Sequence, residues 1–553
     1  MRGWLALTAA LACIASSTAI AQTQPPSGGQ LLQQLTLPPP PPPADKPALS
    51  IEHPNSALAT NTTPIAVRQI HISGNTLLPT PKLHALVASA EGQTLTLGQL
   101  QTLAERISRL YHQKGYPLTR AYVPAQSIRD GEVTIAVLEA RYGTITLNNT
   151  SSTSSGPLAA TLAPLVSGAP VSEEPLDRTL LLMSDIPGVL VNSTLRPGTS
   201  AGTSDLAVDA TSAPRYTGLV AVDDFGNPYT GRARGTGVFN IDSMLHQGDK
   251  LNATVLTSGA GMSYGQLAYR YLLNGSGTTV GVSASDLYYR LSGSLSALGA
   301  NGTAQADSLD VKQPLIRGID SNLYLQLQFD HRRLDDHIDE VGSITDRHTD
   351  GFTAVLAGDH RDDTGVTNFS VAASVDHVTF DGADSQLADL LGADTQGTDT
   401  HYDLTLARLQ QLNQNNGVLL SFTGQLADRN LDPSDQFYLG GPSNARGYEV
   451  GALTGAQGFL ISAEWRRALP LPWPGAWLGS VFADRGHIDV YRDPFNGSGT
   501  NDATLSDAGL GLHWDGPRQW VLSVQSATRI GPSSPLVKSD SGYRVWAQVQ
   551  KGF

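Results

Sequence analysis

Cysteine is almost absent from this sequence. The single cysteine, Cys13, lies in an apolar stretch over residues 4–14, which follows Arg2 and precedes Ala19-Ile20-Ala21. A basic residue, an apolar run and a small-x-small site in this order are typical of a secretory signal peptide. We therefore expect a mature chain without a thiol for a disulfide, a thiolate metal site or nucleophilic catalysis. Lipid attachment at Cys13 is the alternative, and the residues before it depart by one place from the usual pattern.

Long apolar runs and an excess of basic residues are also missing. After the expected signal peptide no stretch reaches the roughly 18 apolar residues of a membrane-spanning helix, which argues against insertion by helices. The chain has 36 basic and 50 acidic residues, a formal net charge of −14. This balance argues against nucleic acid as a partner, because phosphates require clustered Lys and Arg. With 56 glycines and only 7% aromatic residues, the composition favours many strands and turns over a helical enzyme.

The segment 22–63 reads as a linker rich in Pro, Gln and Thr. Pro38 to Pro43 form an unbroken polyproline run, which must be extended and semi-rigid. Just before it, the segment 28–37 carries three leucines at helical spacing, which predicts a short helix tethered by the proline spacer. A disordered tail fits the same residues.

Two small α+β units follow, over 64–141 and 142–214. The first has the order β-α-α-β-β, with a strand at 65–72, helices at 79–90 and from Thr96 to Gly115, and strands at 119–124 and 132–138. The second repeats this order more faintly, with strands at 142–148, 189–195 and 205–210 and a helix at 175–184. A helix at 157–165 is interrupted by Pro164.

From residue 215 to 553 strand follows strand. Segments such as 323–330, 369–376 and 418–426 alternate apolar and polar residues with a period of two. A soluble sandwich would alternate as well, but the secretory context, the long polar loops and the terminal aromatic Phe553 favour a membrane barrel. The fold class is therefore an all-β transmembrane barrel of about 16 antiparallel strands, preceded by two small α+β domains. Phe553 is the expected barrel assembly signal.

Two motifs in the barrel segment form a candidate site. Arg446-Gly447-Tyr448 ends a Gly- and Pro-rich segment that begins at Gly440, and Phe482, Asp484 and Gly486 share one strand face by period two. A guanidinium in a narrow lumen cannot lose its proton and needs a carboxylate partner, and a glycine on the wall leaves room for a loop. An ordinary exposed turn and an ordinary lumen charge are the alternatives.

This order of domains and motifs resembles the two-partner secretion transporters of the haemolysin activation and adhesin secretion type, the TpsB family, whose periplasmic units are POTRA domains. The segment 440–448 is similar to the family's V-R-G-(Y/F) loop tip, with Ala445 in place of Val, and 482–486 matches its F-x-D-x-G inner-wall motif. The resemblance implies that Arg446 pairs with Asp484 and that the helix at 28–37 occupies the pore at rest.

The resemblance further implies an outer-membrane transporter with its POTRA-like domains in the periplasm. It would recognise an unfolded secreted exoprotein that carries an N-terminal secretion domain and move it to the cell surface or medium. Outer-membrane lipid and the barrel assembly machinery are its other expected partners, and nucleic acid is not. The alternative is an insertase of the same superfamily. A passive porin or siderophore channel gives no reason for the periplasmic units, and these units look too small for an autotransporter passenger.

We expect no enzymatic activity, no cofactor, no catalytic residue and no metal site. The linear motifs of zinc proteases and of nucleotide-binding loops are missing, although scattered Ser, His and Asp residues of an enzymatic barrel would leave no such motif. Two segments, 330–340 and 359–363, are dense in Asp and His. Both are expected at strand ends, where a solvated loop or turn is a better interpretation than a metal site.

Overall fold

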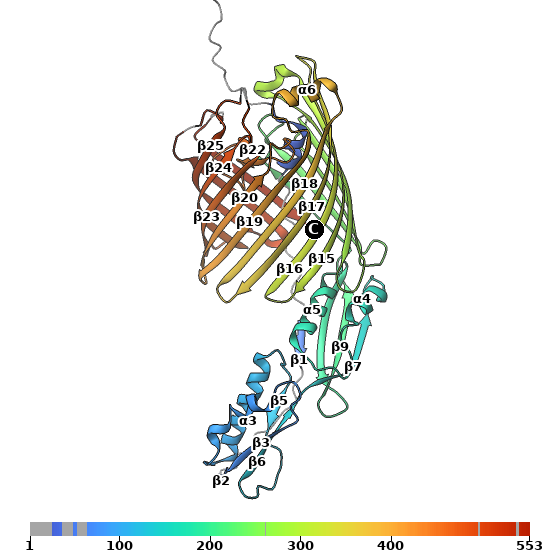
Figure 1. The fold of residues 1–553 in the computed structure, drawn as a ribbon, viewed down its shortest axis with the longest axis vertical. Helices are drawn as coiled ribbons and strands as arrows, with labels where there is room; N and C mark the ends of the chain where they lie inside the picture. The colour runs from blue at the N-terminus through green and yellow to red at the C-terminus, as the bar shows by residue number, and fades with distance from the viewer. Residues whose placement is uncertain are drawn as a thin grey trace, which may run out of the picture.

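The computed structural model describes residues 25–35, 48–51, 63–259, 261–495, 498–532, 534–537 and 541–553. In these ranges the chain forms a closed β-barrel with two small α+β units at one end (Figure 1). The expected signal peptide, Cys13 and the polyproline run lie outside the described residues.

The first α+β unit is a three-stranded sheet with a long helix packed on it. Its elements are β2 (Ile65–Ala66), β3 (Gln69–Ser73), α2 (Thr80–His84), η1 (Ala88–Ala90), β4 (Thr94–Leu95), α3 (Leu97–Gln113), β5 (Arg120–Tyr122) and β6 (Glu132–Leu138). The sheet order is β3-β6-β5, with β3 parallel and β5 antiparallel to β6. The helix expected at 79–90 is wrong as one element, because the backbone leaves the helical region at Val87 (φ −122°, ψ −12°).

Helix α3 follows from its sequence. Thr96 and Gln99 form a capping box, since each side chain accepts a hydrogen bond from the backbone N–H of the other residue. Leu100 and Ile107, both fully buried, lie on the apolar face that packs against the sheet. Past the helix end, Gly115 has φ +78°, which favours glycine after a helix C-terminus.

The second unit repeats the arrangement next to the barrel. Its elements are β7 (Arg141–Asn149), α4 (Ser155–Leu162), α5 (Glu173–Ser184), β8 (Val189–Pro197) and β9 (Thr203–Ser212). Helix α4 ends two residues before Pro164, which cannot donate a backbone hydrogen bond. A strand that the sequence did not suggest, β1 (Ala48–Ile51), comes from the linker and pairs in parallel with β8 at the sheet edge, so that the order is β1-β8-β9-β7.

Sixteen antiparallel strands close the barrel, which confirms the predicted fold class. They are β10 (Tyr216–Asp223), β11 (Arg234–Asp242), β12 (Lys250–Thr257), β13 (Met262–Leu272), β14 (Thr279–Arg290), β15 (Ala300–Arg317), β16 (Ser321–Ile338), β17 (Ser343–Asp362), β18 (Gly365–Phe380), β19 (Gly397–Asn413), β20 (Asn416–Ala427), β23 (Gln457–Leu469), β24 (Ala476–Asp489), β25 (Asp502–Asp515), β26 (Trp520–Arg529) and β27 (Tyr543–Gly552). The first and last strands meet at a seam, where the register runs from Leu219↔Gly552 to Asp223↔Gln548.

The two faces of the wall differ as a membrane barrel requires. On β18, Val371 and Val375 are 45% and 46% exposed on the outer face, whereas Ser374 and Asp376 are buried on the inner face. An apolar exterior with a polar interior suits lipid outside and water inside. The connections carry α6 (Ala383–Leu391), η2 (Gly293–Leu298) and η3 (Pro517–Gln519).

Within the described residues, every helix is too short or too polar to span a membrane.

The second α+β unit contacts the turns at the adjacent end of the barrel (Figure 1). The Arg317 guanidinium donates two hydrogen bonds to the Asp185 carboxylate at 2.8 Å each. From α5, Arg178 also donates to the backbone oxygen of Pro314, at 3.0 Å. These contacts fix the second α+β unit beneath the barrel opening.

The expectation that the two Asp- and His-rich segments form a solvated loop or turn is wrong for most of their residues, although 359–362 do lie at a strand end as expected. Residues 330–338 lie inside β16, and 359–362 form the end of β17. These strands have 18 and 20 residues, whereas roughly 9–11 residues suffice to cross the bilayer. The polar segments therefore extend the β-ladder beyond the part of the barrel that crosses the bilayer.

Candidate functional site in the barrel lumen

A long connection between β20 and β23, residues 428–456, folds back into the barrel and is called the inward loop below. It contains β21 (Phe437–Leu439) and β22 (Leu453–Gly455), which pair with each other. Its tip turns at Gly440 (φ +106°), where a Cβ would lie 2.0 Å from the backbone oxygen of Glu449. Only glycine fits this close approach.

Arg446, at the loop tip, is fixed to the wall by a bidentate ion pair. Its Nε donates to Asp484 Oδ2 at 2.8 Å and its Nη2 to Asp484 Oδ1 at 2.9 Å. The same guanidinium donates from Nη1 to Glu464 Oε2 at 2.6 Å and from Nη2 to Ser462 Oγ at 3.1 Å. Arg446 and Asp484 are only 7% and 4% exposed. A buried pair of this geometry strongly constrains the position of the loop tip.

The other two residues of the wall motif shape the space around this pair. The Phe482 ring lies under the Arg446 guanidinium, with 3.3 Å from Cζ to the ring centroid, which adds a cation–π contact. A Cβ at Gly486 would lie 2.6 Å from Leu439 Cδ1 of the inward loop. The glycine thus leaves the room that β21 needs, as its place in the motif suggested.

Gly447 and Tyr448 continue the contact on neighbouring strands. A Cβ at Gly447 would lie 2.6 Å from Asp507 Cβ, so the tip approaches β25 closely. The Tyr448 hydroxyl donates to the backbone oxygen of Ser506 at 3.2 Å, and Arg529 stacks on its ring at 4.6 Å. The whole predicted loop motif is therefore seated against the wall.

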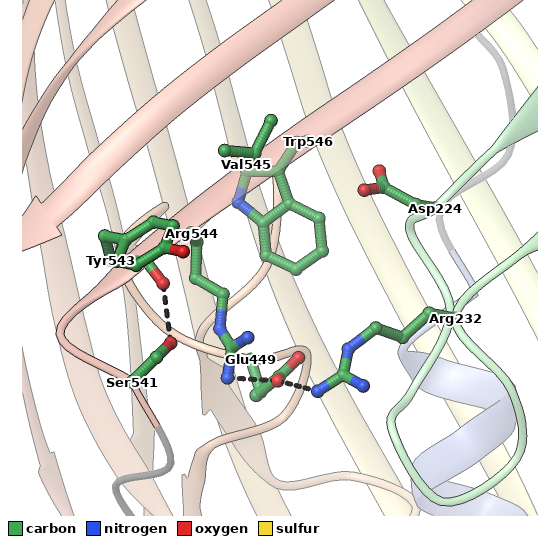
Figure 2. Close-up of a pocket in the computed structure, with 8 residues that line it drawn as sticks. All are labelled: Asp224, Arg232, Glu449, Ser541, Tyr543, Arg544, Val545 and Trp546. Carbon is green, nitrogen blue, oxygen red and sulfur yellow. Dashed lines mark hydrogen bonds and ion pairs between the residues drawn. The ribbon is translucent and has the colours of Figure 1, made fainter.

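The inward loop also contacts both sides of the barrel seam (Figure 2). Glu449 forms ion pairs with Arg232, in the β10–β11 connection, and with Arg544 on β27. Trp546 of β27, which is only 2% exposed, donates from Nε1 to the backbone oxygen of Arg446 at 2.8 Å. The loop tip therefore holds the first and last strands in addition to the wall motif.

Helix α1 (Gly28–Gln33) lies inside the barrel beside this loop (Figure 1). The Gly28 N–H donates to Asp336 Oδ1 at 2.7 Å, and Leu31, 2% exposed, packs into an apolar cluster of the wall. Arg347 donates to Asp336 at 2.8 Å and to Asp432 of the inward loop at 2.5 Å. The Asp336 carboxylate thus links the helix to the buried guanidinium that pairs with the inward loop.

Phe553 lies at the outer surface of the seam. Its backbone exchanges two hydrogen bonds of 3.0 Å with Gly218, and its side chain is 57% exposed.

Sequence reasoning missed Glu464, Glu449 and Trp546. Glu464 and Ser462 share the inner face of β23 by period two, so the sequence marks them as lumen residues without indicating which group they meet. The sequence gives no signal for Glu449, because its partners come from opposite ends of the barrel segment.

A sixteen-stranded barrel with a buried Arg–Asp ion pair in its lumen and POTRA-like units at one end defines a polypeptide transporter of the outer membrane. Residues 65–140 match the ShlB-type POTRA domain, and residues 202–512 match the haemolysin secretion/activation protein family ShlB/FhaC/HecB. The chain belongs to this family. It is a two-partner secretion transporter, which recognises an unfolded exoprotein in the periplasm and translocates it to the cell surface or medium.

Individual relatives agree with this assignment. The heme/hemopexin transporter protein HuxB of Haemophilus influenzae (strain 86-028NP) is 26% identical over 495 residues, 89% of this chain and 87% of HuxB. The outer membrane transporter CdiB of Dickeya dadantii is 23% identical over 76% of each chain. The structure of CdiB from Escherichia coli has a TM-score of 0.70 at 20% identity, covering 91% of this chain and 93% of that one.

The insertase alternative has a more distant structural counterpart. BamA from Haemophilus ducreyi, lacking POTRA domains 1–3, has a TM-score of 0.53 at 13% identity, covering 89% of this chain and all of that one. At this identity the likeness shows the barrel fold alone. The secretion function therefore holds over barrel assembly.

Proposed function

We propose that the exoprotein enters as an added strand at the edge of the second POTRA unit, where it displaces β1. The N-terminal secretion domain of the exoprotein arrives first, and the lumen opens when α1 leaves it. The Arg446–Asp484 pair holds the inward loop as a lock on the pore. No chemistry on the exoprotein is required at any step, so the transporter acts without being an enzyme.

The pairing of β1 with β8 is the observation that carries this proposal. The register covers four residue pairs, from Ala48↔Asn192 to Ile51↔Leu195, and the strands are parallel. Parallel pairs are slightly less stable per residue than antiparallel ones, and four residues give few hydrogen bonds. An unfolded polypeptide that pairs with β8 over more residues than β1 can replace β1 at this edge, because its backbone offers a full row of hydrogen-bond donors and acceptors.

Displacement of β1 can act on the lumen through the short segment that connects β1 to α1. Only residues 36–47 separate the last described residue near α1, Leu35, from Ala48, the first residue of β1. When a segment is bound at both ends, release of one end removes the tether that keeps the other end close to its binding site. Capture of the exoprotein at β8 therefore favours departure of α1 without any energy source in the periplasm.

The first POTRA unit offers a second edge. Strand β5 (Arg120–Tyr122) pairs with β6 on one side, and no other described strand pairs with it. Tyr122 on this strand is 47% exposed. An exposed edge with an aromatic side chain suits an extended polypeptide, so β5 extends the capture surface.

The remaining expected partners concern the barrel itself. The exposed valines of the outer face suit contact with outer-membrane lipid. Phe553, exposed at the seam end of the last strand, suits recognition by the barrel assembly machinery during insertion.

The capture step is tested by locking β1 to β8. Ser50 and Thr194 are register partners, and neighbouring strands lie about 4.8 Å apart, within the range that a disulfide bridges. We expect the double variant Ser50→Cys/Thr194→Cys to lose at least tenfold in exoprotein export when oxidised and to recover with reductant. The two single variants are the controls.

Normal export by the oxidised, fully cross-linked double variant contradicts exchange at β8. Loss of export in a single variant as well would instead attribute the effect to the substitution.

A further inference from the structure

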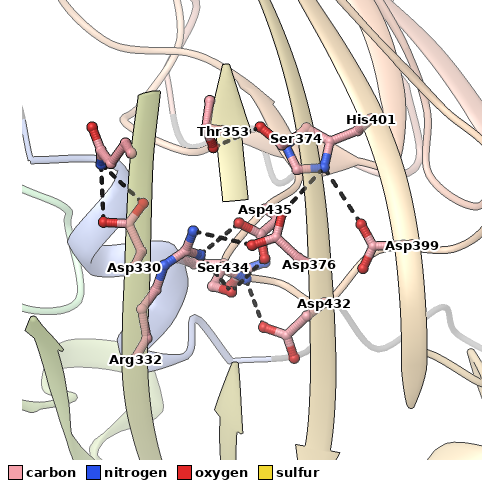
Figure 3. A network of polar contacts seen from close by, with 12 residues as sticks. Asp330, Arg332, Thr353, Ser374, Asp376, Asp399, His401, Asp432, Ser434 and Asp435 are labelled. Carbon is pink, nitrogen blue, oxygen red and sulfur yellow. Dashed lines mark hydrogen bonds and ion pairs between the residues drawn. The ribbon is translucent and has the colours of Figure 1, made fainter. Parts of the chain in front are cut away.

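Three potential metal ligands lie together on the inner face of β18 and β19 (Figure 3). Asp376 and Asp399 are register partners on the two strands, and His401 follows two residues after Asp399 on the same face. One ligand atom from each side chain lies within 4.8 Å of the other two. This group lies outside the lock and outside the segments that the sequence marked as dense in Asp and His.

The group carries buried negative charge that the surrounding side chains do not balance. Asp376, Asp399 and His401 are 2%, 0% and 7% exposed. The Oδ2 atoms of both aspartates are buried and have no hydrogen-bond partner. Arg332 donates to Asp435 at 2.5 Å and lies 3.6 Å from Asp376 Oδ1. Arg332 is thus shared between Asp376 and Asp435, and Asp399 pairs with the His401 imidazole. Buried carboxylates with incomplete charge compensation are unfavourable, and a metal ion removes this penalty.

The spacing of the ligand atoms fits a small divalent ion. His401 Nδ1 lies 3.4 Å from Asp399 Oδ1 and 3.8 Å from Asp376 Oδ2. Ligands about 2.0–2.1 Å from a tetrahedral ion lie about 3.3 Å from one another, so small side-chain shifts suffice. On β17, a Cβ at Gly351 would lie 2.2 Å from Asp376 Oδ1, so the glycine makes room for this carboxylate.

We infer that Asp376, Asp399 and His401 bind one divalent first-row transition-metal ion in the barrel wall. Two carboxylate oxygens and one imidazole nitrogen suit Zn²⁺ or Mn²⁺, whereas Ca²⁺ takes six to eight oxygen ligands. Asp403 Oδ2 faces the other ring nitrogen, Nε2, at 3.9 Å. A proton on Nε2 directed to this carboxylate leaves the Nδ1 lone pair for the ion.

The ion would act on the inward loop as well as on the wall. Asp435 belongs to that loop, and Arg332 bridges it to Asp376. An ion at Asp376 and Asp399 frees the guanidinium to pair with Asp435 alone. The bound ion therefore holds the base of the inward loop in its seated position.

The test uses the tag-free, full-length protein in detergent, treated with EDTA and then dialysed against Zn²⁺. We expect about one Zn²⁺ per chain by elemental analysis, and at least tenfold weaker binding in Asp399→Asn and His401→Gln. His377→Gln is the matched control, because His377 lies on β18 but is exposed on the other face. Mn²⁺ binding, followed by electron paramagnetic resonance, should be lost in the same variants.

Each other outcome decides against the site. Wild type that retains neither Zn²⁺ nor Mn²⁺ overturns the inference, and so do variants that bind the ions as tightly as wild type. Folding is checked by the heat-dependent shift in gel mobility of the barrel, and Asp376→Asn serves if one variant fails to fold. Zn²⁺ should also raise the unfolding temperature of wild type and of His377→Gln, but not of Asp399→Asn.

Discussion

Arg446 and Asp484 join the tip of the inward loop to the barrel wall through two parallel hydrogen bonds of 2.8 and 2.9 Å. Both side chains are buried, so the pair is shielded from water and salt. Removal of one partner of a buried pair destabilises the local structure by about 3–5 kcal/mol, because the other charge stays buried without compensation. Arg446→Ala leaves Asp484 in that state, whereas Glu464 keeps its ion pair with Arg466.

We therefore expect Arg446→Ala to reduce exoprotein secretion at least tenfold while the barrel still folds. Arg446→Lys should recover part of the activity, because an ammonium keeps the charge but cannot bind Asp484 in the bidentate manner. The matched control is Arg466→Ala, since Arg466 donates to Glu464 at 2.8 Å but does not contact Asp484. Secretion is measured in the culture medium and barrel folding by heat-dependent gel mobility. Loss of the folded barrel in Arg446→Ala would make the pair structural.

The close approach of the loop tip predicts a graded effect of added methyl groups. Gly447→Ala places a Cβ 2.6 Å from Asp507 Cβ, which cannot move without the strand, whereas the shortest contact of Gly486→Ala, at 2.6 Å, is to the end of the Leu439 side chain, with the backbone oxygen of Phe459 at 3.0 Å. Overpacking of this kind destabilises by roughly 1–3 kcal/mol. We expect Gly447→Ala to impair secretion more than Gly486→Ala.

Gly265→Ala is the control for both variants, because a Cβ at this position on β13 meets no atom within 4 Å. Equal secretion by all three variants would show that the seated position of the loop tip does not matter for transport.

The position of α1 predicts that transport requires its departure. A Cβ at Gly28 would lie 3.4 Å from Ala304 Cβ on β15, close to the roughly 3.5–4.5 Å that separates the Cβ atoms of disulfide-bonded cysteines. Oxidised Gly28→Cys/Ala304→Cys should therefore block export, with recovery after reduction. Ion conductance of the purified barrel should stay low in the oxidised variant and rise after reduction. Undiminished export through the cross-linked barrel would exclude the lumen beside α1 as the route.

The first POTRA unit should lose stability in acid through Glu139. This carboxylate is buried and accepts hydrogen bonds from the Thr76 and Leu77 amides and from the Tyr111 hydroxyl at 2.7–2.8 Å. Burial alone would raise the pKa of Glu139, but these hydrogen bonds lower it below its usual value. The contribution is therefore complete above the pKa of the unfolded chain and is lost as the pH falls through the folded pKa.

Glu139→Gln should lower the unfolding temperature of the periplasmic units at pH 7 and flatten its dependence on pH below about 4.3, the ordinary pKa of glutamate. Calorimetry of the full-length protein measures this transition. Glu132→Gln is the control, since Glu132 lies on β6 with an exposed side chain. An equal effect of both substitutions would assign the acid sensitivity to net charge.

The pairing of Arg446 with Asp484 was predicted through the resemblance to the TpsB family, and the chemistry of the residues supported it. Arg446 follows a glycine-rich turn and needs a carboxylate partner, and Asp484 lies between Phe482 and Gly486 on one strand face. The contribution of Glu464 was not visible, because alternation marks every second residue of β23 as facing inward. Only the closed barrel decides which inward residue meets the guanidinium.

Strand β1 illustrates a second limit. Residues 48–51 sit in the Pro-rich linker and are too few to show a period, and their partner strand begins at Val189. A strand that forms only on another sheet's edge leaves no local signal. Long-range pairing also explains why the sequence did not predict a strand at 330–338. Ladder pairing with β15 and β17 keeps that polar segment extended.

The most direct test of the central claim asks whether a large exoprotein encoded beside this chain requires the chain for export. Cells with and without the transporter are compared for exoprotein in the culture medium and for correct assembly of other outer-membrane barrels. Two-partner secretion predicts that export requires the transporter while those barrels assemble normally. Unchanged export together with accumulation of unassembled barrels would contradict it and assign the chain to barrel assembly.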